Sequence, residues 1–303
     1  MLSERPLVSD AVVRVRDLGK EIHNSVFGRI LRRTIRRAGW GARRMLGALP
    51  EDGDETAYRL GLIREDQSQK ERTYSFSWGR MSYLNLGDLR AQYRDIFLKG
   101  QYEFTPDNDS PTIVDCGGNI GMSVVWFHLR YPQARITVFE PDPTSATILR
   151  RNVARFPFRR TDVLEAAAWV STGEINFEAT GGVDARVASG GGISSVKSVR
   201  LAEALPGEVD LLKLDIEGAE FEVVIDLCNT GAIARIKNIV AECHVTQDKV
   251  ADFLEMCQVL RKNDMRICLS EAKTRTSLHG AEVSAPFAGL RGGQFLVELY
   301  AWR

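Results

Sequence analysis

The segment TIVDCGGNIGMS at residues 112–123 constrains the fold of this chain more than any other part of the sequence. β-Branched residues lead into closely spaced glycines, and a stretch that favours a helix follows, so we predict a buried strand, a tight turn and a helix N-terminus. Gly117, Gly118 and Gly121 have no Cβ, which permits tight turning and close approach of a ligand to the backbone. Free N–H groups at such a helix start are expected to bind an anionic or carbonyl-like group.

Glycine spacing and charge together indicate which cofactor this turn accepts. A dinucleotide-binding turn has the pattern G-x-G-x-x-G, whereas this turn reads GGNIG, so NAD is not expected. Asp115 precedes the glycines, and its carboxylate would repel a pyrophosphate but attract the α-ammonium group of S-adenosylmethionine. The turn is therefore predicted to bind S-adenosylmethionine.

The next predicted strand ends in VFEPDP, which places Glu140 at its carboxyl end. A carboxylate there can accept hydrogen bonds from both hydroxyls of a ribose. Pro141 and Asp142 would then border an adenine pocket, and Ala168, in the small-residue run EAAAW, would form a wall of it. The alternatives are that Glu140 is an ordinary exposed acid at a strand end and that the alanines only fill the core.

Acids gather at the ends of two later strands, in DLLKLDIEGAE and VAECHV. Because the carboxyl ends of parallel strands form one edge of a sheet, Asp215 and Glu217 are expected to lie near His244. His244 is the predicted general base, since imidazole titrates near neutrality, and Asp215 is the second candidate for taking the proton of an acceptor hydroxyl. Alternatively, Glu217 and Glu220 only stabilise a helix N-terminus, and His244 is structural.

Two further expectations concern charges in the same region. Lys213 falls in a strand expected to be buried on both faces, so it should be paired or functional. The acids and His244 together could also hold a divalent metal ion, although transfer without a metal is the favoured prediction.

Downstream of Pro111, short β-branched runs alternate with helical stretches, which is the pattern of βαβ units. The predicted fold class is α/β: a Rossmann-like fold with a mostly parallel seven-stranded sheet and helices on both faces. Strands are predicted at residues 112–115, 136–140, 163–169, 209–216, 236–242, 265–269 and 295–302. Helices are predicted at 88–98, 121–130, 143–155, 218–228 and 247–263.

After the third strand, GEINFEAT is predicted as a hairpin partner, and the glycine-rich residues 181–192 as a mobile loop or a lid.

The N-terminal part of the chain differs in charge from the rest. Residues 11–50 contain ten Lys or Arg against Asp17 and Glu21, a net charge of +8, so the remaining residues carry −8 because the whole chain is neutral. We predict a basic, mainly helical extension over residues 1–70 and a catalytic domain over residues 71–303. The extension could touch an anionic membrane, a partner or a second copy of the chain, or pack on its own domain. Nucleic acid is not expected as the substrate, because a negatively charged domain gains little from phosphate contacts.

No secretory signal and no apolar run of membrane-spanning length is visible in the sequence. The expected location is therefore the cytoplasm, with peripheral contact to the inner face of a membrane left open.

Five ordered blocks, IVDCGGNIG, FEPDP, AAAWVSTGEINF, LLKLDIEGAE and AECH, resemble those of FkbM-type methyltransferases over residues from about 73 to 303. The resemblance implies a class I methyltransferase fold, S-adenosylmethionine as methyl donor, and an acceptor hydroxyl on a sugar, glycolipid or natural product. It also implies which residues match the family's cofactor motif: Asp115, Gly117, Asn119, Gly121 and Glu140. Asp215, Glu217 and Glu220 match a second block. Family members often have alanine at the position of Gly118, and the segment before residue 50 lies outside the resemblance.

The sequence therefore predicts an S-adenosylmethionine-dependent O-methyltransferase that acts on a small polyhydroxylated molecule. The alternative is a catalytically weak Rossmann-like module that docks to a membrane or a partner through its basic N-terminus.

Overall fold

The computed structural model describes residues 56, 60–61, 63, 70–158, 160–178, 186–187, 194–270, 273–274 and 294–303. All of these belong to the unit Asp52–Arg303. The predicted basic helices of residues 11–50 lie outside the described residues, as does most of the glycine-rich segment 181–192. The division of the chain near residue 70 therefore stays a prediction.

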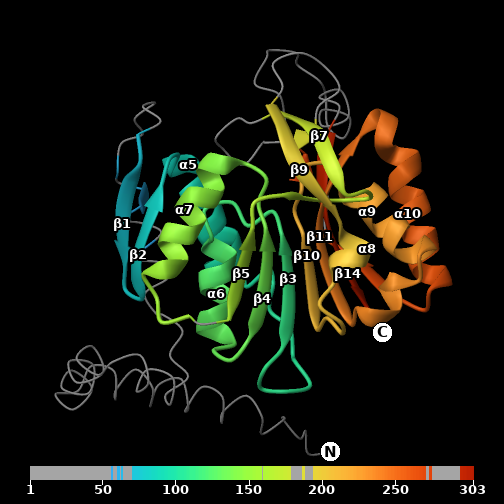
Figure 1. Ribbon diagram of the computed structural model, residues 1–303, viewed down its shortest axis with the longest axis horizontal. Helices are drawn as coiled ribbons and strands as arrows, with labels where there is room; N and C mark the ends of the chain where they lie inside the picture. Colours follow the sequence, from blue (N-terminus) through green and yellow to red (C-terminus); the bar gives the residue numbers. More distant parts are fainter. Residues whose placement is uncertain are drawn as a thin grey trace, which may run out of the picture. The chain divides into compact units, whose positions relative to one another are not determined.

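A large twisted sheet forms the centre of the described part of the chain (Figure 1). Its strand order is β12-β14-β11-β10-β3-β4-β5, and β13 adds a short pairing to β14. Neighbouring strands from β11 to β5 are parallel, whereas β14 is antiparallel to both β11 and β12. The strands are β3 (Thr112–Cys116), β4 (Arg135–Phe139), β5 (Thr161–Leu164), β10 (Leu211–Leu214), β11 (Asn238–Thr246), β12 (Arg266–Leu269), β13 (Lys273–Thr274) and β14 (Gln294–Trp302). The predicted Rossmann-like, mostly parallel sheet is confirmed.

Helices cover both faces of this sheet, because its central strands are apolar on both sides. Along β3, Ile113 packs into one apolar cluster and Val114 into the other, as the two-residue period of a strand requires. Figure 1 shows α6 (Met122–Arg130) and α7 (Pro143–Ala154) on one side of the sheet, and α9 (Glu220–Asn229) and α10 (Val250–Lys262) on the other. Short helical turns complete the second side: α8 (Leu201–Ala204), η2 (Ala232–Arg235) and η3 (Gln247–Lys249).

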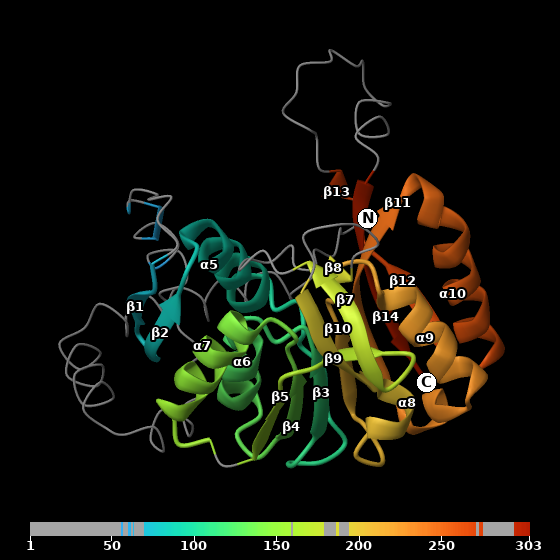
Figure 2. The same ribbon diagram turned by 45° about the horizontal axis from the view of Figure 1, so that its top comes forward.

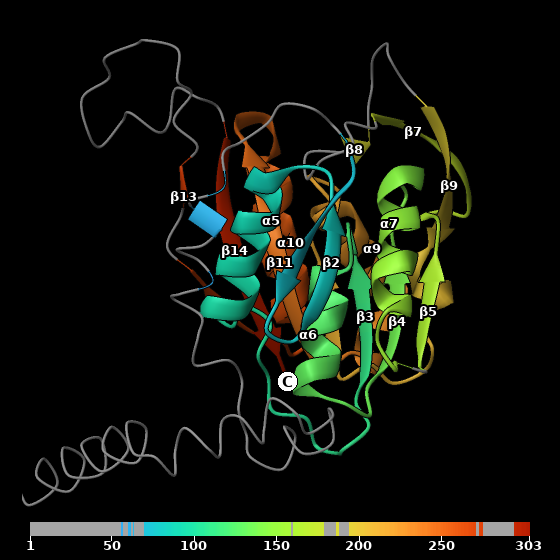
Figure 3. The ribbon, with the colours of Figure 1, turned by 90° about the vertical axis from the view of Figure 1, so that its left-hand side faces the viewer.

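The chain ahead of the large sheet forms a cap on the side of α6 and α7 (Figure 3). We define the cap as the described residues 70–104, with the hairpin β1 (Arg72–Phe76) and β2 (Gly79–Tyr83), then α5 (Leu86–Gln92) and the π-helix η1 (Tyr93–Leu98). Asn85 begins α5, since its side chain accepts hydrogen bonds from the N–H groups of Gly87 and Asp88. The predicted helix at 88–98 is present and changes from α to π geometry at Tyr93.

The prediction of one strand over residues 163–169 was wrong. Residues Thr161–Leu164 end the large sheet as β5, and β6 (Ala167–Trp169) belongs to a second sheet of order β6-β9-β7-β8. Figure 2 shows β7 (Gly173–Glu178), β8 (Arg186–Val187) and β9 (Ser194–Arg200) as a group apart from β3, β4 and β5. The segment GEINFEAT therefore pairs with β9, which follows it, and not with the strand before it. A continuous apolar pattern does not reveal where a chain leaves one sheet for another.

Candidate functional site

A cavity of about 360 Å³ opens at the carboxyl ends of the central strands, which is within the usual size range of small-molecule sites. The loops after β3, β4 and β10, residues of β6, β11 and β14, and the cap all contribute to it. Its lining is Ala91, Gln92, Arg94, Asp95, Ile96, Gln101, Tyr102, Gly117, Gly118, Asn119, Ser123, Glu140, Pro141, Ala167, Ala168, Lys213, Asp215, Ile216, Glu217, Ala219, Glu242, His244 and Leu296.

The glycine loop after β3 is held by backbone contacts. The N–H groups of Gly117 and Gly118 both donate to the carbonyl oxygen of Phe139, at 2.9 and 3.1 Å. Gly117 has a φ of 88°, and a Cβ there would lie 1.8 Å from the backbone oxygen of Asp215. The absence of a side chain at Gly117 therefore lets the loop approach the residue after β10.

Gly118 is also required by packing within the protein. A Cβ at this position would lie 2.3 Å from Cγ1 of Val138 and 2.7 Å from Cδ1 of Leu149. An alanine at this position, which FkbM-type methyltransferases often have, would require the side chains of Val138 and Leu149 to move. Gly121, with a φ of 86°, begins α6 in a left-handed conformation, so the predicted turn into a helix is present.

Glu140 follows β4 as predicted and is buried, with 6% of its surface exposed. Oε2 accepts a hydrogen bond from the N–H of Asn119 at 2.7 Å, and Oε1 accepts one from the N–H of Asp142 at 2.9 Å. Burial raises the pKa of this carboxyl to about 7, against the lowering effect of these two hydrogen bonds. Each oxygen keeps a lone pair that can accept a further hydrogen bond.

The predicted adenine-pocket residues separate into two groups. Pro141 and Ala168 line the cavity, as does the neighbouring Ala167. Asp142 does not line it, because its Oδ1 accepts a hydrogen bond from the N–H of Ser145 at 2.7 Å and begins α7. The prediction that Asp142 borders the pocket is corrected: its carboxylate is a helix cap, and only its N–H group contacts Glu140.

Asp115 is fully buried beneath the glycine loop. Oδ2 accepts a hydrogen bond from the hydroxyl of Ser123 at 2.5 Å, and Oδ1 lies 2.9 Å from Nζ of Lys213. Asp115 is not part of the cavity lining, so the expected direct contact with an ammonium group does not fit this arrangement. The cation that faces Asp115 is Lys213.

Lys213 is paired, as predicted for a lysine in a buried strand. Besides Asp115, its ammonium group donates to the carbonyl oxygens of Gly117 at 2.9 Å and Cys116 at 3.3 Å, and lies 3.7 Å from Asp215. Burial lowers the pKa of this ammonium, but the two aspartates outweigh burial and raise it overall. Lys213 therefore ties the glycine loop to β10 as a permanent cation.

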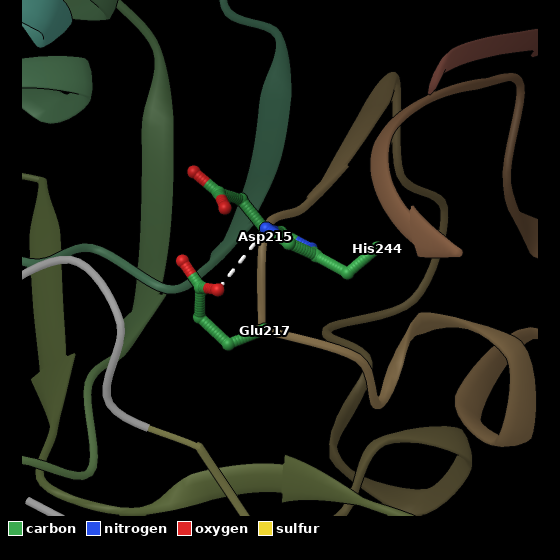
Figure 4. A group of neighbouring side chains, drawn as sticks. All are labelled: Asp215, Glu217 and His244. Atoms are coloured by element: carbon green, nitrogen blue, oxygen red, sulfur yellow. Dashed lines mark ion pairs between the residues drawn. The ribbon is translucent and has the colours of Figure 1, made fainter. Parts of the chain in front are cut away.

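Figure 4 shows that the side chains of Asp215 and Glu217, which follow β10, converge with the side chain of His244, which lies in β11. Nε2 of His244 lies 3.0 Å from Oε2 of Glu217, and Nδ1 lies 3.2 Å from Oε1 of Glu220. Glu220 is fully buried and also accepts hydrogen bonds from the N–H groups of Ile216 and Gly218. These acids and His244 therefore lie close together, as predicted.

His244 is only 4% exposed, and both of its ring nitrogens face carboxylates. Burial lowers the pKa of the imidazole, but the hydrogen bonds and charges of Glu217 and Glu220 outweigh burial and raise it to about 12. A protonated imidazole has no lone pair with which to accept a proton, so this arrangement does not present His244 as the predicted general base. Asp215 and Glu217, whose side chains are 29% and 16% exposed, are the carboxylates that reach the cavity from this group.

The cap supplies cavity residues that the sequence did not reveal: Gln92, Arg94, Asp95, Gln101 and Tyr102. Gln101 is 7% exposed and its Nε2 has no hydrogen-bond partner among the described residues, while the ring of Tyr102 lies 5.5 Å from the ammonium of Lys213. The helix at 88–98 was predicted, but the contacts of the cap with the cavity depend on packing between distant segments.

Within the described part of the chain, no helix is both long enough and apolar enough to cross a membrane.

The fold and the cavity together define a Rossmann-like methyltransferase, with a glycine loop after β3 and acids after β4, after β10 and within β11. The profile described as the methyltransferase FkbM domain matches residues 115–267, which is half of the chain. The protein belongs to this family of methyltransferases.

Similar proteins agree with this assignment over part of their length. Methyltransferase sdnD of Sordaria araneosa is 39% identical over 77 residues, which are 25% of this chain and 30% of that protein. The 31-O-demethyl-FK506 methyltransferase FkbM of Streptomyces tacrolimicus is 32% identical over 80 residues, again 25% of this chain and 30% of that protein. The matched segments thus span less than a third of the length of either relative.

Solved structures resemble the chain more distantly. TYW2 of P. horikoshii in complex with MeSAdo has a TM-score of 0.44 at 10% identity, covering 82% of this chain and 81% of that one. TYW2 of M. jannaschii in complex with AdoMet has a TM-score of 0.41 at 11% identity, covering 79% and 88%. At these values the likeness does not bear on function, and the family assignment depends on the sequence match.

Proposed function

We propose that this protein transfers the methyl group of S-adenosylmethionine to a hydroxyl oxygen of a sugar, glycolipid or other polyhydroxylated natural product. The observation that carries the proposal is that one cavity joins the glycine loop and Glu140 to the carboxylates of Asp215 and Glu217. The first pair suits a nucleoside cofactor, and the second suits an acceptor hydroxyl. Membership of the FkbM methyltransferase family supports the reaction class.

The residues around Glu140 fit an adenosine group. Glu140 has two oxygens held in place by backbone N–H groups, so it can accept hydrogen bonds from both ribose hydroxyls without rearranging. Pro141 and Ala168 offer small apolar surfaces for the adenine ring. Asn119, whose side chain accepts hydrogen bonds from Gln92 and from the N–H of Ile120, fixes the end of the glycine loop beside the methionine part. S-adenosylmethionine would supply a methyl group on a positively charged sulfur.

Asp215 is our candidate for the residue that orients the acceptor and takes its proton. Its carboxylate lies on the cavity, next to the glycine loop that would hold the cofactor. In the proposed step the acceptor oxygen forms a bond to the methyl carbon as the bond from carbon to sulfur breaks. The hydroxyl proton passes to the carboxylate of Asp215 and leaves with solvent after the reaction.

An oxygen acceptor is favoured by one relative and by charge. The name of the Streptomyces tacrolimicus relative describes a methyltransferase that acts on 31-O-demethyl-FK506. Several carboxylates line the cavity here, including Asp215, Glu217 and Glu242, which disfavours the phosphates of a nucleic acid. A docking module without catalysis would have no use for acids gathered in a cavity, so the alternative prediction is not favoured.

Calorimetric titration with S-adenosylmethionine and S-adenosylhomocysteine tests the cofactor, with NADH as a negative control. We expect both sulfur nucleosides to bind, and Glu140→Gln to weaken their affinity at least about tenfold, since a hydrogen bond to a charged group contributes roughly 1.5–3 kcal/mol. Glu165→Gln is the matched control, because Glu165 is an exposed acid that pairs with Arg150 outside the cavity. Absence of binding in the unmodified protein, or equal losses in both variants, would contradict the proposal.

A further inference from the structure

Asp215, Glu217 and His244 offer one ligand atom each, and these three atoms all lie within 4.8 Å of one another (Figure 4). We infer that they form a binding site for a divalent metal cation such as Mg²⁺ or Mn²⁺. Two carboxylate oxygens and one imidazole nitrogen suit cations that prefer oxygen but accept nitrogen. The three residues come from the ends of the adjacent strands β10 and β11, so the central sheet fixes their spacing.

Orientation of the histidine is the second observation that points to a cation. Metal-binding histidines almost always donate their other ring N–H to a carboxylate or carbonyl group, which fixes the ring and its tautomer. Here Nδ1 of His244 lies 3.2 Å from Oε1 of Glu220, a fully buried carboxylate. Glu220 is itself held by the N–H groups of Ile216 and Gly218. This arrangement directs Nε2 toward Glu217 and Asp215, where a cation would bind in place of the proton that Nε2 carries in the metal-free protein and release that proton to solvent.

The balance of charge gives a third argument. Three carboxylates, those of Asp215, Glu217 and Glu220, surround the imidazole, and Glu242 lines the same cavity. Lys213, the other cation of this group, lies 2.9 Å from Asp115 but 3.7 Å from Asp215, so its closest carboxylate is Asp115. Buried charges in proteins are usually paired or bound to a metal. A divalent cation would supply positive charge where carboxylates are in excess.

The site is also accessible and incomplete in the way a catalytic metal site is. Asp215 and Glu217 line the cavity, so a cation can enter from it. Three protein ligands leave further coordination positions, which would face the cavity and accept water or acceptor oxygens. This part of the inference rests on the proposed function: it favours an acceptor with two neighbouring oxygens, such as a vicinal diol, whose hydroxyl the cation would make more acidic.

Binding of Mn²⁺ to the full-length protein, followed by the electron paramagnetic resonance signal of the free ion, tests the inference directly. After chelator treatment and dialysis, we expect one Mn²⁺ per chain, displaced by Mg²⁺. Asp215→Asn and Glu217→Gln should each weaken binding at least about tenfold, and Glu220→Gln about 10- to 100-fold through the orientation of His244. Asp95→Asn is the control, because Asp95 lines the same cavity but pairs with Arg94 and Lys99.

Circular dichroism and affinity for S-adenosylhomocysteine show whether each variant is folded. A protein that binds S-adenosylhomocysteine but no Mn²⁺, or binds Mn²⁺ equally well in the Asp215→Asn and Glu217→Gln variants, overturns the metal site and leaves the proposed function standing. Binding of Mn²⁺ with the expected variant losses supports the metal site whether or not the sulfur nucleosides bind. Loss of Mn²⁺ binding in Asp95→Asn equal to that in Asp215→Asn also overturns it.

Discussion

Several residues of the cavity are both charged and buried, and Glu140 shows how burial changes the pKa of a carboxyl group. The carboxyl is buried, and its pKa is about 7, compared with a usual value of 4.5. Desolvation disfavours the charged form, and the two backbone hydrogen bonds only partly offset it. The residue that would bind a ribose therefore changes its charge within the physiological pH range.

The affinity for S-adenosylhomocysteine is predicted to depend on pH through Glu140. Because its pKa is raised to about 7, the carboxylate that accepts the ribose hydrogen bonds is lost as the pH falls through that value. If only the carboxylate binds, affinity should fall about tenfold per pH unit below the pKa and stay level above it. Calorimetry between about pH 5.5 and 8.5 measures this. The Glu140→Gln variant should lack the dependence, and a level profile in the unmodified protein would contradict the assignment.

For the unliganded protein the same shift has the opposite consequence. A carboxyl group whose pKa is raised in the folded state binds its proton more tightly there than in the unfolded chain. At low pH it therefore stabilises the folded state relative to the unfolded state. Its contribution is fully present below the unfolded value of 4.5 and is lost as the pH rises through about 7. Stability and cofactor affinity should therefore respond to the ionisation of Glu140 in opposite directions.

At the scale of elements, the cap is held by polar contacts to α7 and the glycine loop and by a cluster of aromatic rings. Asn152 of α7 accepts a hydrogen bond from the N–H of Ser82 at 2.7 Å and donates to the carbonyl oxygens of Ser82 and Ile120. One buried side chain thus joins β2, α7 and the glycine-loop side of the cavity. The rings of Phe76 and Trp78 stack at 4.4 Å within the same apolar cluster.

Removal of this junction is predicted to destabilise the protein. Asn152→Ala would leave buried backbone groups of β2 without partners, so we expect a loss of about 2–4 kcal/mol in the free energy of unfolding. Urea denaturation measures the change. Asn229→Ala is the control, since Asn229 lies exposed at the end of α9 and should change stability by less than about 0.5 kcal/mol. Similar values for the two variants would show that Asn152 does not hold the cap.

At the scale of the whole molecule, the two apolar clusters lie on opposite faces of one sheet, and the acids lie at its carboxyl edge. Residues inside the strands stabilise the fold, whereas residues at the strand ends can bind ligands and react. Every described residue that lines the cavity lies within the unit Asp52–Arg303. We therefore propose that cofactor binding does not need the basic residues 11–50.

Truncation of residues 1–50 is predicted to leave the affinity for S-adenosylhomocysteine within about twofold of the full-length value, because no ligand group of the proposed site is removed. Calorimetry on both forms measures the affinity, and circular dichroism checks that the shorter chain is folded. A folded truncated protein with affinity reduced tenfold or more would show that the basic segment takes part in cofactor binding.

Features that depend on neighbouring residues in the chain could be read from the sequence. The strand, glycine turn and helix around Gly117 are a local pattern, and so is the acid that ends each strand, such as Glu140 or Asp215. The order of strands and helices then implied a parallel sheet, and a parallel sheet brings its carboxyl ends together. Asp215 and Glu217 were therefore correctly predicted to lie near His244.

Contacts between distant segments decided the rest. Lys213 reaches the carbonyl of Cys116 across 97 positions of sequence, and it occupies the position expected for a ligand's ammonium group beside Asp115. The sequence could not show that His244 lies between two carboxylates or that Gln101 reaches the cavity. Which partner a side chain meets depends on packing, because the free energy of burying a charge is set by its neighbours in space. Local sequence patterns thus predict which kind of site is present, whereas the charge and the partners of each group in it depend on contacts between segments that are distant in the chain.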